Sequence, residues 1–464
     1  MKSLRHKLGA AGTAAALAVT LAACSSSGTN TTSGPSSSSA AASPITLRVV
    51  SLIPGSDKAA FDAFDAQVAQ FEAANPDIKI KSEEYEWTGP TFTAQLAGGT
   101  LPDVFTIPFT DGLTLLENGQ LANITTDFKK LPYADKFNPN VLAQVQDSKG
   151  DVFGVPTAAY GSALHYNRAL FTQAGLDPNS PPKTWDEVRK DAKTISDKLG
   201  VAGFAQMAAS NTGGWQLTVA TYARGGRMEV EKNGKTTVTA DNAGTLKALQ
   251  YLHDLRWTDN SMGANFLLDW GTINQAFGAG QVGMYTSGSD IYTNLIQAQG
   301  MNPPNYGATV IPLDGSAAGT LGGGTIAAVN VKADAAHKAA ALRWIDFYYM
   351  QKLINQNAAA LDAKTLSGSK QAVGVPALPI FDKATFDESR VWIKDYINVD
   401  QSHVNYFNDG IGAQALVPEP KAHTQELYAA LDVVVQAVLT DKNADYQSML
   451  KDVNKQIQAL VDAG

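Results

Sequence analysis

The sequence holds a single cysteine among its 464 residues, Cys24. One cysteine excludes an intramolecular disulfide framework, so the folded part must be stabilised by a large hydrophobic core. Blocks of basic residues are also lacking, and 36 basic against 44 acidic residues give a net charge of −8. This balance argues against binding to nucleic acid and against a polybasic membrane surface.

Catalytic motifs are lacking as well. The sequence contains no Gly-x-Ser-x-Gly elbow and no His-Glu-x-x-His pair, and the glycine run LGGGTI (321–326) is not followed by Gly-Lys-Ser/Thr. We therefore expect no cofactor, no metal and no catalytic residue, and interpret the glycine run as a strand at which two backbones approach closely. Carboxylates are abundant, so a glycosidase pair stays open.

The only long apolar run lies near the start, at residues 8–23, after Lys2, Arg5 and Lys7. It is shorter than the ~20 residues of a membrane-spanning helix, and we interpret 1–23 as a signal peptide. The segment Leu-Ala-Ala-Cys24 resembles the lipobox of bacterial lipoproteins, which implies a lipid on the Cys24 sulfur; an ordinary signal peptide with an incidental cysteine is the alternative. Residues 24–44 are rich in Ser, Thr and Gly and are expected to form a disordered tether.

The pattern beyond residue 44 favours an α/β fold. Strands are predicted at 45–52, 78–87 and 102–107, with helices at 57–74 and 112–121, an order typical of a parallel sheet. A helix over 184–199 starts at a capping box made by Thr184 and Glu187. Residues 228–239 predict a hairpin turning at Asn233-Gly234, and 337–356 and 445–461 predict two more helices.

Aromatic residues stand beside turn-forming residues at four places: Trp87, Tyr160, Trp215 and Trp270. The C–H face of a sugar packs on such rings while short polar groups bind its hydroxyls. Packing in the core is the alternative for each of them. We expect it outright for Trp185 and Trp344, which lie within predicted helices.

Three stretches, 150–196, 276–290 and 305–349, resemble the family 1 extracellular solute-binding proteins of ABC importers in their order and spacing. The resemblance implies a two-lobed, periplasmic-binding-protein-like (type II) α/β fold with a hinge between the lobes. Lobe 1 is then 45–158 and 312–360, and lobe 2 is 159–311 and 361–464. The hinges fall near 158–162 and 307–312, and the lobes close on a ligand in the cleft.

Ten residues are expected to contact the ligand. From their motifs and the resemblance these are Trp87, Thr110, Asp111, Tyr160, Trp215, Ser289, Asp290, Gly323, Gly324 and Tyr428. Asp290 departs from the family, whose members commonly have tryptophan there. A carboxylate cannot stack on a sugar but accepts hydroxyl hydrogen bonds, which favours a ligand that is held differently.

The resulting hypothesis is a lipid-anchored, monomeric receptor on the extracytoplasmic face of the cytoplasmic membrane. It would capture a mono- or oligosaccharide and deliver it to the permease subunits of an ABC importer without changing it chemically. The alternatives are a cell-surface glycosidase or other hydrolase, and a surface scaffold that no longer binds solute.

Overall fold

The computed structural model describes residues 43–56, 58–85, 87, 89–232 and 235–463. The expected signal peptide, Cys24, residues 25–42 of the expected tether, and the Asn233-Gly234 turn lie outside the described residues. All that follows concerns the unit formed by residues 44–464.

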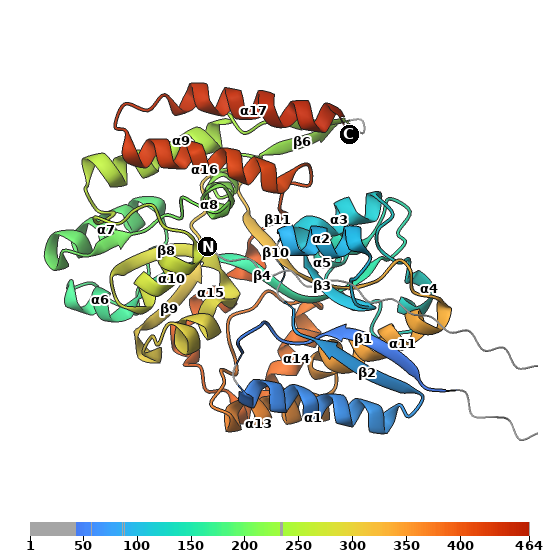
Figure 1. The fold of residues 1–464 in the computed structure, drawn as a ribbon. Coiled ribbons are helices and arrows are strands. Elements are labelled where there is room, and N and C mark those ends of the chain that lie inside the picture. The colour runs from blue at the N-terminus through green and yellow to red at the C-terminus, as the bar shows by residue number, and fades with distance from the viewer. Residues whose placement is uncertain (1–42, 57, 86, 88, 233–234, 464) are drawn as a thin grey trace, which may run out of the picture. The chain divides into compact units, whose positions relative to one another are not determined.

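Nine strands of the described residues form one mixed sheet, and two more form a separate hairpin (Figure 1). The strands are β1 (Ile45–Val50), β2 (Ile78–Glu83), β3 (Val104–Pro108), β4 (Gly154–Asn167), β5 (Ala202–Phe204), β6 (Glu229–Lys232), β7 (Lys235–Val238), β8 (Val282–Gly288), β9 (Tyr306–Val310), β10 (Thr320–Val329) and β11 (Leu416–Pro418). The strands predicted near the start are confirmed, and β1, β2 and β3 pair in parallel. The prediction of a parallel sheet is wrong for the sheet as a whole, because β10 comes from late in the chain and runs antiparallel to both β3 and β4.

β4 is the strand that connects the two halves of the sheet. Its first part, from Gly154 to Gly161, pairs with β10, and its second part, from Ser162 onward, pairs with β8 and β9. The pairing of β4 with β10 is irregular between Thr325 and Ile326 of β10. The change of partners therefore falls within the expected first hinge region, 158–162.

Helices cover the sheet on both sides (Figure 1). They are α1 (Lys58–Ala74), α2 (Gly89–Gly98), α3 (Phe109–Glu117), α4 (Thr125–Phe128), α5 (Pro139–Leu142), α6 (Arg168–Gln173), α7 (Trp185–Leu199), α8 (Thr212–Tyr222), α9 (Ala243–His253), α10 (Trp270–Gly278), α11 (Ala335–Ile345), α12 (Gln351–Ile354), α13 (Gln356–Gly368), α14 (Lys383–Ile393), α15 (Asn405–Asn408), α16 (Thr424–Thr440) and α17 (Tyr446–Ala463). The predicted capping box of α7 is present, with Thr184 accepting from the backbone of Glu187. The segment 337–356, predicted as one helix, comprises α11, a π-helical turn at Asp346–Met350 and α12.

The buried side chains form two hydrophobic clusters. The first includes the β1–β3 region and continues onto one face of β8 and β9, and the second lies beneath α7, α8, α9, α16 and α17. Trp344 is fully buried in the first, as expected. Phe381, assigned to lobe 2 from the resemblance, packs on Phe137 of lobe 1 with ring centroids 4.7 Å apart.

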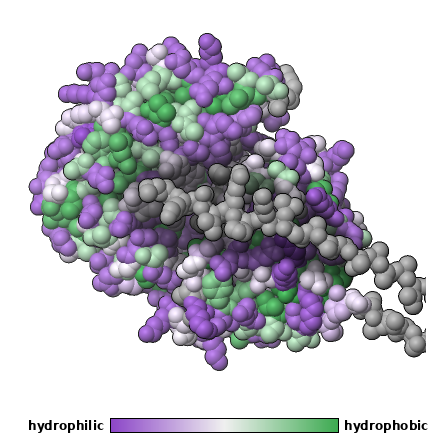
Figure 2. All heavy atoms as spheres, in the orientation of Figure 1, coloured by the Kyte–Doolittle hydropathy of each residue, from purple (hydrophilic) through white to green (hydrophobic). Residues whose placement is uncertain are grey.

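Hydrophilic residues are spread over the visible face of the molecule, with hydrophobic residues between them (Figure 2). Within the described ranges, no helix has the length and hydrophobicity that crossing a membrane requires.

Candidate functional site

Trp215 lies in the first turn of α8, where α16 crosses it. A Cβ on Gly214 would lie 2.3 Å from the carbonyl oxygen of Tyr428 in α16, so only glycine allows the two helices to approach this closely. The Asp432 side chain of α16 accepts hydrogen bonds from the backbone N–H groups of Asn211 and Gly214, both at 2.7 Å. These bonds satisfy donors at the start of α8 and hold Trp215 in place.

Asp290 lies in the short 3-10 turn directly after β8. The strand is fixed to α8 because Gln216 donates to the backbone oxygen of Thr286 at 2.7 Å. A Cβ on Gly288 would lie 2.6 Å from Asp290 Oδ1 and 3.1 Å from Cδ2 of Tyr160, so the carboxylate and the tyrosine ring flank this glycine. Asp290 and Trp215 are therefore positioned by the same packed elements.

These side chains surround a pocket of about 310 Å³. Its lining residues are Tyr160, Thr212, Trp215, Trp270, Ser287, Gly288, Asp290, Ile291 and Asn294. The rings of Tyr160 and Trp215 meet edge to face, with centroids 6.4 Å apart. The pocket therefore combines three aromatic side chains with short polar groups and one carboxylate, as expected of a site for a small polar ligand.

Glu419, which follows β11, is joined to this pocket through Tyr160. The hydroxyl of Tyr160 donates to its Oε1 at 3.1 Å, and the hydroxyl of Tyr428 donates to its Oε2 at 2.6 Å. A Cβ on Gly323 would lie 2.4 Å from the Tyr160 hydroxyl and 2.9 Å from Glu419 Oε1. The absence of a side chain at Gly323 in β10 thus leaves space for the Glu419 carboxylate and the Tyr160 hydroxyl.

A second group of predicted residues lies around the start of α3. Thr110 donates weakly to Asp111, at 3.4 Å, and the Trp87 indole lies close enough to Asp111 to stabilise its charge. The indole N–H nevertheless forms no hydrogen bond among the described residues. The negative charge of Asp111 contributes to raising the pKa of Glu419, which places these two carboxyl groups within electrostatic reach of each other.

The three carboxyl groups share an unusual electrostatic setting. Burial raises the pKa of Asp111 to about 6 and that of Glu419 to about 7. Burial also raises the pKa of Asp290; its side chain is open to solvent through the pocket, yet protein atoms surround it closely. No lysine or arginine of the described residues contributes to the shift of any of the three. Desolvated carboxyl groups without a counterion are typical of functional sites.

The remaining predicted residues are placed differently. Ser289 is fully buried, and its hydroxyl has no hydrogen-bond partner among the described residues. Tyr428 is 3% exposed and donates to Glu419, so its ring presents no stacking face in this conformation. A Cβ on Gly324 would lie 2.2 Å from the carbonyl oxygen of Ala158, which confirms that LGGGTI is a strand with closely approaching backbones.

Sequence reasoning missed several residues of the site. Glu419 was not predicted, because nothing local in Val-Pro-Glu-Pro indicates that it lies beside Tyr160. Trp270 was noted as an aromatic beside a turn but not included among the ligand contacts; it is 41% exposed and lines the pocket. Thr212, Ser287 and Asn294 carried no signal of their own.

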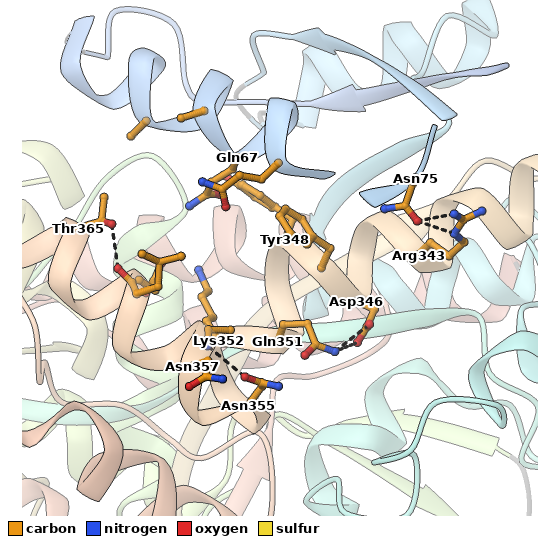
Figure 3. Close-up of a pocket in the computed structure, with 17 residues that line it drawn as sticks. Gln67, Asn75, Arg343, Asp346, Tyr348, Gln351, Lys352, Asn355, Asn357 and Thr365 are labelled. Atoms are coloured by element: carbon orange, nitrogen blue, oxygen red, sulfur yellow. Dashed lines mark hydrogen bonds between the residues drawn. The ribbon is translucent and has the colours of Figure 1, made fainter. Parts of the chain in front are cut away.

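A cavity of about 740 Å³ lies elsewhere, between α1 and the helical stretch from α11 to α13 (Figure 3). None of the predicted ligand-contacting residues lines it. Arg343 there donates to Asn75 and pairs with Asp77, and Asp346 accepts hydrogen bonds from a tyrosine and a glutamine. Because Arg343 and Asp346 already have partners within the protein and no predicted contact lies there, we place the functional site at the pocket of Trp215 and Asp290.

No group of three or more His, Cys, Asp or Glu side chains within the described ranges is arranged to hold a metal ion. The arrangement is instead suited to binding an organic solute through ring faces and hydrogen-bond acceptors.

Comparison with known proteins supplies an independent view of the fold. Residues 66–378, about two thirds of the chain, match the model of a family described as bacterial extracellular solute-binding protein. The sn-glycerol-3-phosphate-binding periplasmic protein UgpB of Shigella flexneri is 30% identical over 158 residues, which cover 32% of this chain. The match spans 35% of UgpB, about a third of the length of that relative.

Solved structures are similar over almost the whole described unit. An ABC transporter solute-binding protein from Thermotoga lettingae, bound to α-D-tagatose, has a TM-score of 0.71 at 18% identity, covering 90% of this chain and 100% of that one. Maltose-bound MalE3 of T. maritima has a TM-score of 0.68 at 19% identity, covering 90% and 100%. These identities show a shared fold, and the expected two-lobed periplasmic-binding-protein-like architecture is confirmed.

Proposed function

We propose that this chain, which belongs to the bacterial extracellular solute-binding proteins, captures a carbohydrate in the cleft at Trp215 and delivers it to the membrane subunits of an ABC importer. The observation that carries the proposal is the pocket of about 310 Å³ in which Tyr160, Trp215 and Trp270 surround Asp290. Ring faces bind the C–H surface of a sugar, and a carboxylate together with serine and asparagine binds its hydroxyls.

The second candidate is a glycerol phosphate, because the chain shares 158 residues with a glycerol-3-phosphate-binding protein. A phosphate is normally bound by arginine, lysine or a helix N-terminus. The pocket at Asp290 is lined by no arginine or lysine among the described residues, and the helix starts beside it, of α8 and α10, already donate to Asp432 and Asp269. Three carboxyl groups in the cleft would also repel a phosphate, so the structure favours the carbohydrate.

Thermal denaturation of the intact chain over a panel of mono- and oligosaccharides, sugar alcohols and glycerol 3-phosphate tests the proposal. At a ligand concentration 100 times Kd, binding adds about 2.7 kcal/mol to the free energy of unfolding. We expect at least one carbohydrate to raise the melting temperature. Stabilisation by glycerol 3-phosphate and by no carbohydrate would contradict the choice of ligand.

The same samples also test the two alternatives, a hydrolase and a surface scaffold. Cleavage of a labelled oligosaccharide, abolished by Glu419→Gln, would favour a hydrolase over a binding protein. Absence of stabilisation by every solute would favour a surface scaffold.

The proposal includes a lipid anchor at Cys24, from which the serine-rich tether would hold a monomeric receptor at the extracytoplasmic face of the membrane. Cells fed labelled palmitate should incorporate the label into the native chain and not into Cys24→Ser. The variant should also leave the membrane fraction. Equal membrane association of both chains would contradict the anchor.

A further inference from the structure

Asp290 differs from Glu419 and Asp111 in its hydrogen bonding, because the only group in the described part of the chain that favours its charged form is its own backbone. Glu419 accepts hydrogen bonds from two tyrosines, and Asp111 accepts one from Thr110. Among the described residues, no other side chain donates a hydrogen bond to Asp290, and none forms an ion pair with it. The side chain of Asp290 thus keeps acceptor capacity for a ligand in the pocket that it lines.

The surroundings of Asp290 are negative as well as aromatic. The pKa of the Tyr160 hydroxyl is raised well above its usual value by burial and then by the charges of Glu419 and Asp290. Tyr160 thus lies within reach of both carboxyl groups, and Asp111 adds its charge at Glu419. Lys421 lines a separate cavity of about 220 Å³ and does not contribute to the shift of any of these groups.

The walls of the pocket are an independent observation that points to the same kind of ligand. Tyr160, Trp215 and Trp270 line it together with Asp290. The negative faces of aromatic rings attract a cation, and an adjacent carboxylate adds a charge-assisted hydrogen bond. A bare metal ion is disfavoured because the described residues offer no cluster of metal ligands.

We propose that Asp290 is an anionic subsite for a protonated amine, so that the receptor selects an amine-bearing sugar or sugar alcohol over its neutral and phosphorylated counterparts. The part concerning the carbohydrate rests on the proposed function, whereas the part concerning the amine rests on Asp290 and the aromatic walls. The ammonium group binds the carboxylate, and the remainder of the ligand packs on Trp215 and Trp270.

Isothermal titration calorimetry of the intact chain with matched ligand sets tests this inference. Each set compares an amino sugar with its hydroxyl and N-acetyl forms: glucosamine with glucose and N-acetylglucosamine, and the same for galactosamine. N-methylglucamine with sorbitol forms a further set. Choline and spermidine serve as cations that are not sugars, and glycerol 3-phosphate serves as the anion.

We expect at least one amine to bind roughly ten-fold more tightly than both neutral forms, because an ion pair with the carboxylate replaces a hydrogen bond from a neutral group to it. Asp290→Asn keeps the size of the side chain but removes its charge. It should abolish this preference by weakening the amine more than the hydroxyl form, because the asparagine oxygen still accepts a hydrogen bond from a hydroxyl but forms no ion pair with an ammonium group. Asp452→Asn, an exposed position on α17, is the matched control and should keep the preference.

The contrary outcomes separate the two proposals. A neutral sugar that binds as tightly as its amine, and that Asp290→Asn weakens, overturns the amine subsite and leaves the carbohydrate proposal standing. Binding of choline or spermidine alone, lost in Asp290→Asn, supports the amine subsite and contradicts the carbohydrate. Binding of glycerol 3-phosphate alone, or of none of the amines, overturns the amine subsite.

Discussion

At the scale of single residues, Trp215 joins the fold and the ligand site. It is half-buried, packing partly against both hydrophobic clusters, and its remaining surface lines the pocket. Trp215→Ala should therefore weaken carbohydrate binding by about 1–3 kcal/mol, measured by calorimetry, because an anchoring ring surface is lost.

Trp185→Ala is the control for this prediction. The guanidinium carbon of Arg224 lies 4.1 Å from the centroid of the Trp185 ring, and Trp185 does not line the pocket. It should lower thermal stability and leave the dissociation constant unchanged. A Trp215→Ala variant that unfolds without any change in affinity would show that the ring serves the core alone.

Glu419 should make stability depend on pH. In the unfolded chain this group titrates near 4.5, whereas burial raises its pKa to about 7 in the folded protein. The folded state thus binds more protons between these values, and the free energy of unfolding falls as pH rises through this window. Glu419→Gln should remove about 1–3 kcal/mol of that fall in urea denaturation series.

Because Asp111 and Glu419 interact electrostatically, the difference between the two pH profiles reports the titration of Glu419 together with its coupling to Asp111. Glu117→Gln, at an exposed position on α3, should retain the native profile. Identical slopes for the native chain and Glu419→Gln would contradict the burial of a titrating carboxyl group.

The residues predicted for the site differ in how far local sequence could identify them. Tyr160, Trp215 and Asp290 lie beside glycines or turn residues, and the structure brings all three to one pocket. Glu419 could not be found in this way, because its role depends on Tyr160, 259 positions away. Tyr428 hydrogen-bonds to Glu419, and its burial against α8 follows from a helix crossing that sequence does not show.

At the scale of elements, the glycines of β10 allow β4 and Glu419 to pack closely against this strand. A Cβ on Gly323 would lie 2.4 Å from the Tyr160 hydroxyl, so Gly323→Ala must displace Tyr160 or Glu419. We expect the variant to lose about 1–3 kcal/mol of stability in urea denaturation, the usual cost of overpacking, and to bind ligand more weakly.

Gly412→Ala is the matched control, because no heavy atom lies within 4 Å of its added Cβ. It should be close to neutral in both measurements. Equal stability and equal affinity of the two variants would show that Tyr160 can move away from β10 without loss of stability or binding.

The elements also show where local prediction succeeds and where it stops. The start of α7 was predictable because its capping box lies within four residues, and its end because Gly200 adopts a positive φ of 69°. The mixed character of the sheet was not predictable from the first three strands. It is set by β10, which enters between β3 and β4 from more than 150 residues later in the chain.

At the scale of the whole described unit, we propose that relative motion of the two expected lobes depends on β4. Its partners change between Gly161 and Ser162, close to the irregular pairing of β4 with β10. Pro156 of β4 lies at this irregularity and has no N–H to donate to the ladder. A local interruption of the ladder beside a change of partners is a suitable place for a hinge.

Binding of the carbohydrate should therefore shorten the distance between the lobes. This distance can be measured by double electron–electron resonance between two spin labels. One label is placed at Asn118→Cys, directly after α3, and the other at Lys190→Cys in α7. Both variants are made in a Cys24→Ser background, which removes the native thiol. We expect the main distance to decrease by several ångströms when ligand is added, because only the closed form contacts it from both lobes. A pair at Lys190→Cys and Asp452→Cys, both within lobe 2, should not change. Equal distances with and without a ligand that calorimetry shows to be bound would mean that the cleft is preformed and that the permease recognises the receptor by another feature.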